Sequence, residues 1–146
     1  EHLNLRSIVG LIDVASNQVI ARGLSMPHSP RVHQGRVFLL DSGHGRVVTV
    51  EPDTGSIDTI AELLGYTRGL AIHERYGFVG LSRIRENSQF GGLPIKDRVD
   101  QMQCAVHVMD LLTGQITDFL VFESGCSELF DAQVLARIRG PALVGF

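Results

Sequence analysis

The sequence has no tryptophan and a single lysine, and its 13 basic residues are scattered rather than clustered. The formal net charge is -3, so the chain lacks the basic stripe that marks a nucleic-acid surface. No apolar run is long enough to cross a bilayer, and the first residues have neither the charged start nor the apolar middle of a signal peptide. We therefore expect a soluble, cytoplasmic protein that binds neither nucleic acid nor membrane.

Cysteine is scarce as well. Cys104 and Cys126 are the only two, and no CxxC spacing is present. A disulfide framework or a zinc site requires more thiols or a closer spacing, so two buried, reduced thiols are expected. The sequence contains no convergent set of metal ligands, and we expect neither a metal ion nor another cofactor.

What the chain does have is a repeated β-hairpin pattern, present in three copies. Each copy is an alternating apolar strand that ends in an acidic residue, followed by a turn and a second strand. The acidic residues are Asp13, Glu51 and Asp110, and the turn residues that follow them are Asn17, Gly55 and Gly114. Asparagine and glycine tolerate the positive φ that a tight hairpin requires. Repetition of such units predicts an all-β fold of the β-propeller type, built from four-stranded antiparallel blades.

Aligning the hairpins assigns two complete blades and two halves. The first complete blade comprises residues 27–33, 36–40, 46–51 and 56–62, and the second comprises 68–73, 77–82, 105–110 and 115–122. The chain opens with a half-blade at residues 7–22 and closes with another at 129–138 and 142–146. The spacing in 129–138 also fits a helix, but its place in the repeat favours a strand. Residues 1–146 are thus expected to form one domain of about three blade-equivalents.

Three blade-equivalents cannot close a ring, and an open arc would leave unpaired strand edges at both ends. A C2 homodimer solves this economically, because the last strands of one copy would complete the blade that the other copy begins. The result would be a ring of about six blades with no free edge. The alternative is that the chain is the back part of a longer propeller.

The candidate site of a propeller is the mouth of its central channel, where loops from successive blades meet. Repeat-aligned residues at the start of the innermost strands are His28, Arg68 and, approximately, Glu128. The loop after residue 40 adds Asp41 and Ser42. These side chains are polar and mixed in charge, which favours a small anionic or sugar-like ligand.

A long insertion, residues 83–103, lies at the same mouth, and long loops in compact domains often carry function. Its Arg83 and Arg85, together with Arg68, have the chemistry to clamp a carboxylate or phosphate. The alternative is structural: Arg85 and Glu86 would anchor the loop to a neighbouring blade through ion pairs.

Catalysis is weakly indicated, so the sequence leaves open whether the protein is an enzyme. His28 and Ser29 stand near Asp41 and Ser42, but no nucleophile elbow accompanies them. The prolines that flank the His28-Ser29 pair favour a rigid strand start with a hydrogen-bonded His28.

Several motifs together carry a family resemblance. They are residues 23–31, 39–43, 67–71, 79–83 with 85–87, 92–94 and 110–114. From about residue 23 to the end, the chain resembles an uncharacterised bacterial family of conserved hypothetical proteins with propeller-like repeats. Members of that family are longer, which implies that this chain corresponds to their C-terminal part. The resemblance points to His28, Arg31, Arg68, Arg83, Arg85 and Glu86, and it carries no established activity.

A second likeness, in architecture only, is to the gluconolactonase and regucalcin group of six-bladed, metal-dependent hydrolases. We therefore take a small-molecule-binding module as the leading hypothesis. A lactonase-like hydrolase and a protein-interaction scaffold are the alternatives.

Overall fold

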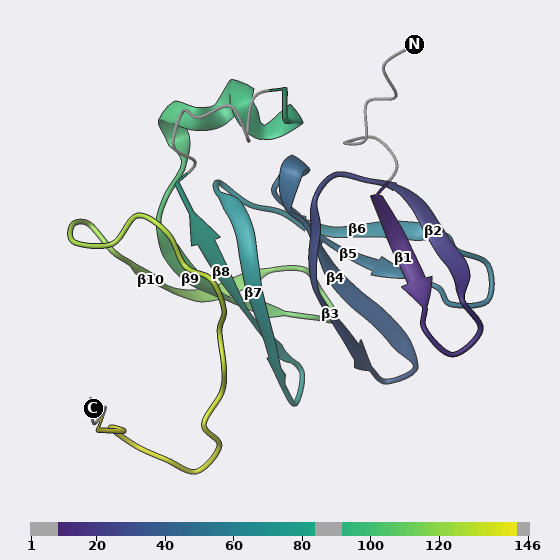
Figure 1. The fold of residues 1–146 in the computed structure, drawn as a ribbon. Coiled ribbons are helices and arrows are strands. Elements are labelled where there is room, and N and C mark those ends of the chain that lie inside the picture. Colours follow the sequence, from purple (N-terminus) through teal and green to yellow (C-terminus); the bar gives the residue numbers. More distant parts are fainter. Residues whose placement is uncertain (1–8, 84–91, 143–146) are drawn as a thin grey trace.

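The computed structural model of the protein describes residues 9–83 and 92–142, which form three antiparallel sheets (Figure 1). The first sheet contains β1 (Val9–Asp13) and β2 (Gln18–Leu24). The second contains β3 (Pro27–His33), β4 (Arg36–Asp41), β5 (Arg46–Val50) and β6 (Ile57–Glu62). The third contains β7 (Tyr66–His73), β8 (Tyr76–Ser82), β9 (Ala105–Asp110) and β10 (Ile116–Val121). The prediction of an all-β chain is confirmed.

Within each sheet the strands follow one another in chain order, so every connection is a hairpin or a loop between neighbours. The three repeated turns adopt the conformation that the sequence predicts. Asn17, Gly55 and Gly114 have φ angles of 56°, 71° and 73°. The last two donate their backbone N–H to the carbonyl of the acidic residue that opens the turn, at 2.8 Å in both copies.

Two short 3-10 helices lie in the loops that follow β4 and β8. These are η2 (Ser42–His44) and η3 (Pro94–Gln101), the latter inside the long insertion. The described part of the insertion is packed rather than free, because Leu93, Ile95 and Met102 are buried against Tyr66. Arg85 and Glu86 lie outside the described residues. Neither of these helices has the length or hydropathy of a membrane span.

The strand expected at residues 129–138 does not form, and neither does the helix that its spacing allowed. After β10 the chain instead runs as an irregular segment past β7 and β8 (Figure 1). A strand needs a neighbour to complete its hydrogen-bond ladder, and no strand of the described chain pairs with this segment. The partner expected for it, residues 142–146, lies outside the described range except for Ala142.

The main core is shared between the second and third sheets. It buries ten side chains, contributed by both sheets and by the loops that join them: Phe38, Leu40, Val47, Leu63, Leu70, Val79, Leu81, Ala105, Met109 and Leu111. A second, smaller core lies between the first and second sheets and contains Ala21, Leu24, Val37, Leu39, Val48 and Val50. The middle sheet is therefore covered on both faces, which explains why β4 is apolar at successive positions rather than alternating.

One contact between successive sheets occurs twice. A Cβ atom built on Gly55 would lie 2.2 Å from the carbonyl oxygen of Ile20, and one on Gly114 would lie 2.3 Å from that of Ile60. Ile20 and Ile60 are each the extra residue of a bulge in the outermost strand of the preceding sheet. Glycine is thus required at both turns for two reasons: the positive φ, and the close approach of the backbone of the preceding sheet.

We expect Gly55→Ala and Gly114→Ala to destabilise the protein more than Gly35→Ala. Gly35 has a similar φ of 77°, but a Cβ there meets nothing within 4 Å. The control should cost about 1 kcal/mol, the penalty for positive φ alone. Overpacking against a carbonyl should add about 1–3 kcal/mol to the other two. Urea unfolding measures the difference, and equal losses for all three variants would contradict the inter-sheet contact.

Candidate functional site

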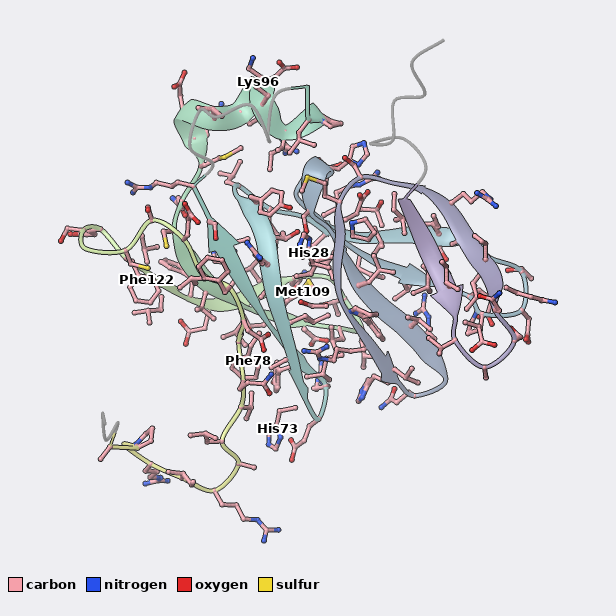
Figure 2. The ribbon with its side chains drawn as sticks, viewed as in Figure 1. His28, His73, Phe78, Lys96, Met109 and Phe122 are labelled. Carbon is pink, nitrogen blue, oxygen red and sulfur yellow. The ribbon has the colours of Figure 1, made fainter. Side chains whose placement is uncertain are left out.

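The predicted mouth is formed by the loops at one end of the strands. It includes the β2–β3 and β6–β7 connections, η2 and the insertion with η3. Figure 2 shows Lys96 on η3 at this end and His73 at the β7–β8 turn at the opposite end. Strands β3 and β7, the first strands of the second and third sheets, lie against each other. They carry His28, Arg31 and Arg68.

Asp41, at the end of β4, has no solvent-exposed surface and acts as a structural anchor. Its carboxylate accepts a hydrogen bond of 2.7 Å from the backbone N–H of Ser25. It also pairs with the guanidinium of Arg46 and lies 2.9 Å from Nδ1 of His44. These contacts tie the β2–β3 connection to η2 and β5, so the structure gives Asp41 a role in shaping the mouth.

Ser42 is fully buried and belongs to a second structural link. Its hydroxyl donates to the carbonyl oxygen of Thr67 at 2.5 Å, which joins η2 to β7. Nδ1 of His28 lies 2.8 Å from the carbonyl oxygen of Met26 and 3.0 Å from Oγ of Ser42. Because a carbonyl can only accept, Nδ1 carries the ring proton.

This tautomer has a chemical consequence. A protonated Nδ1 cannot take the proton of Ser42, and that proton is already given to Thr67. The His28-Ser42 pair is therefore not arranged as a nucleophile and its base. Nε2 is left as the acceptor nitrogen of the neutral His28 ring.

Tyr66 completes this cluster, although sequence reasoning missed it. Its ring meets that of His28 edge-on, with centroids 5.8 Å apart, and its hydroxyl lies 3.7 Å from the sulfur of Met26. Burial raises the pKa of Tyr66, against the opposing effects of the Arg68 charge and a hydrogen bond with Ser42. The one signal in the sequence was an aromatic residue two positions before Arg68.

Two arginines on the inner strands meet the segment that follows β10. The Arg68 guanidinium lies 4.4 Å from the ring centroid of Phe130. Arg31 lies 3.8 Å from the carboxylate of Asp131. Within residues 9–83 and 92–142, Arg68 forms no ion pair. It is a half-buried cation held on an aromatic face.

The segment after β10 hydrogen-bonds to the end of β8, at Ser82 and Arg83. Ser82 occupies the position in the third sheet that Ser42 occupies in the second, and its hydroxyl donates to the carbonyl of Leu129 at 3.1 Å. Leu129 therefore corresponds to Thr67, so Phe130, and not Glu128, is the counterpart of Arg68. Glu128, which directly precedes Leu129, is half-buried.

Arg83 lies at the edge of the mouth. Its side chain is exposed, and its backbone N–H donates to the carbonyl of Ser127 at 2.9 Å. The charges of Arg83 and Glu128 both act on the thiol of Cys104. Arg83 and Glu128 thus lie near Cys104, whereas His28 contacts Met26, Ser42 and Tyr66.

A cavity of about 120 Å³ lies at the other end of the strands, between the second and third sheets. It is lined by His33, Gln34, Arg36, Phe38, Arg75, Leu111 and Leu112. Both of its arginines are engaged within the protein, Arg36 with the hydroxyl of Thr49 at 2.7 Å and Arg75 with the carboxylate of Asp110.

No group of three or more His, Cys, Asp or Glu side chains suited to a metal ion is found in residues 9–83 and 92–142. The hydrolase hypothesis thus has no ligand set in the described part of the chain.

Comparison with known families gives one match. Residues 6–144 match the domain of unknown function DUF4915. The chain belongs to this family. The match agrees with the expectation of an uncharacterised family. It assigns no activity to the chain. No significant match is found among curated proteins.

We expect Asp41→Asn to lower stability by about 1–3 kcal/mol, because Arg46 would lose its carboxylate partner next to a buried site. Asp131→Asn is the matched control, since its ion pair with Arg31 is exposed and long. That change should stay within about 0.5 kcal/mol. Urea unfolding of both variants measures the difference, and equal stabilities would refute the anchoring role of Asp41.

Proposed function

We propose that this DUF4915 chain is a propeller-type binding module that takes a small anionic ligand, such as an organic carboxylate or a sugar phosphate, between β3 and β7. Arg68 would supply the charge, with His28 and Arg31 beside it. The blade assignment draws support from the strand order of the two four-stranded sheets and from the glycine contact repeated between sheets.

The observation that carries the proposal is the state of Arg68. Within the described ranges it makes no ion pair, and it is held over Phe130 at a distance of 4.4 Å. A guanidinium positioned in this way keeps its hydrogen-bond donors available for a carboxylate or phosphate. The other arginines of the inner strands and the opposite cavity already have polar partners.

His28 supports the preference for a ligand that also carries hydroxyl groups. With its proton on Nδ1, the neutral ring offers Nε2 as an acceptor, which Arg68 cannot provide. A donor on β7 and an acceptor on the adjoining β3 match an anionic sugar better than a bare inorganic ion.

The remaining predicted residues take other places in this proposal. Asp41 and Ser42 would hold the mouth in shape through their buried contacts rather than touch the ligand. Arg83 and Glu128 would border it. The roles of Arg85 and Glu86 in ligand binding remain a prediction from the sequence.

Arg68→Gln should weaken ligand binding about 10- to 100-fold, since a charge-assisted hydrogen bond is lost. Isothermal titration with glucose 6-phosphate, citrate and neutral glucose measures this effect. Arg36→Gln, at the opposite end of the strands, is the control and should bind like the unchanged protein. Equal binding by the Arg68 and Arg36 variants, or no preference for the anions over glucose, would overturn the proposal.

A second candidate, a module that assembles with another copy of itself, is favoured by the exposed apolar side chains near the chain's last strand. These are Leu112, Ile116, Phe119, Leu120, Phe130, Leu135 and Ile138. Among residues 9–83 and 92–142, the first sheet has two strands where the other two have four, and no described strand pairs with the free edge of β1. We propose that a second copy covers both ends and closes a ring of about six blades.

Light scattering after size-exclusion chromatography tests this assembly. The expected mass is twice the 16.0 kDa of one chain. Leu120→Asp should shift the protein to a monomer by placing a charge among these exposed apolar side chains, whereas Val32→Asp, on β3, should not. A single-chain mass for the unchanged protein across a concentration series would sink the assembly and leave the ligand proposal standing.

A further inference from the structure

The two cysteines of the chain lie next to each other. Cys104 Sγ and Cys126 Sγ are 3.7 Å apart, and both thiols are free. Cys104 directly precedes β9 and is fully buried, whereas Cys126 is half-buried in the irregular segment after β10. The sequence predicted two plain core thiols, and nothing in their spacing of 22 residues indicated a contact.

The two cysteines are held differently by the surrounding backbone. The carbonyl of Cys104 accepts a hydrogen bond of 2.8 Å from the backbone N–H of Phe122, which fixes the start of β9 against the end of β10. Cys126 belongs to no strand, and its thiol lies 3.3 Å from the carbonyl of Glu128. A disulfide requires about 2.05 Å between the sulfurs, so a small displacement of the Cys126 segment closes the bond.

We infer that Cys104 and Cys126 form a redox couple that is oxidised by a low-molecular-weight disulfide, with Cys126 reacting first and Cys104 resolving the adduct. The division of roles follows from access. Cys126 is partly exposed, whereas Cys104 is buried. A partly exposed thiol beside a buried second one is the arrangement of many redox-sensitive pairs.

The acid-base properties agree with these roles. Burial raises the pKa of Cys104 to about 11, so at neutral pH this residue is a thiol and reacts slowly by itself. Its attack becomes effective only when the adduct is held in contact with it, as the 3.7 Å separation allows.

The chemistry balances in two exchanges. The thiolate of Cys126 attacks one sulfur of oxidised glutathione, forms a mixed disulfide and releases one glutathione thiolate, which takes up the proton that Cys126 lost. Cys104 then attacks the Cys126 sulfur and displaces the second glutathione, to which its proton passes. Two cysteine thiols are oxidised to one disulfide, and one glutathione disulfide is reduced to two glutathione thiols.

The bond would fasten the segment that carries Phe130 to the third sheet. Cys126 precedes Ser127 and Leu129, which already hydrogen-bond to Arg83 and Ser82. An effect of this disulfide on ligand affinity would depend on the proposed site at Arg68. The formation of the disulfide does not depend on that site. Mass spectrometry therefore tests the redox couple independently of ligand binding.

The experiment treats the unchanged protein, Cys104→Ser and Cys126→Ser with oxidised glutathione and measures intact mass. The unchanged protein should lose about 2 Da, the mass of two hydrogens, and recover it with dithiothreitol. Cys104→Ser should keep a glutathione adduct of about 305 Da on Cys126, and Cys126→Ser should remain unmodified.

Peptide mapping of the oxidised, unchanged protein without reductant covers the case in which a serine variant fails to fold. A peptide pair linked through Cys104 and Cys126 supports the inference. An unchanged mass, a persistent glutathione adduct on the unchanged protein, or a disulfide between two chains would overturn it.

Discussion

The structure depends on one repeated contact, in which the bulged outer strand of one sheet abuts the glycine turn of the next. A Cβ atom built on Gly55 would meet the carbonyl oxygen of Ile20, and one on Gly114 would meet that of Ile60 at nearly the same distance. Behind this contact, side chains from facing sheets interlock into a core that is essentially free of solvent. Because the backbone itself sets the spacing, the sheets stack in a fixed register, and the inner strands β3 and β7 are brought side by side.

The candidate site follows from that register. Two polar links hold the loops of the second sheet: Asp41 to Arg46 within that sheet, and Ser42 to Thr67 between η2 and β7. The second link fixes the start of β7, from which Arg68 meets Phe130 in the segment after β10. The same use of a serine hydroxyl recurs at Ser82, which holds Leu129. This recurrence places Phe130 under Arg68, although the segment itself forms no strand.

Local features of the sequence predicted most of the fold. Alternating apolar residues and the turn residues Asn17, Gly55 and Gly114 depend only on neighbours in the chain. The ten strands expected between residues 7 and 122 and the three turns are accordingly present. The strand predicted at residues 129–138 does not form, because a strand also needs a partner strand, which no local pattern encodes. The burial of Asp41 and Ser42 was equally invisible, since a polar residue after a strand reads the same whether it faces solvent or ties two sheets together. Family membership in DUF4915 adds no activity to this picture.

Native-state hydrogen exchange tests the central claim most directly, because it reports the free energy at which each backbone amide opens. If the second and third sheets share one core, amides of β4, β5, β8 and β9 should exchange with the same free energy and the same dependence on urea. Amides of β1 should exchange more readily, since the first sheet packs through the smaller core. Separate opening of the second and third sheets, with distinct dependences on urea, would contradict the account.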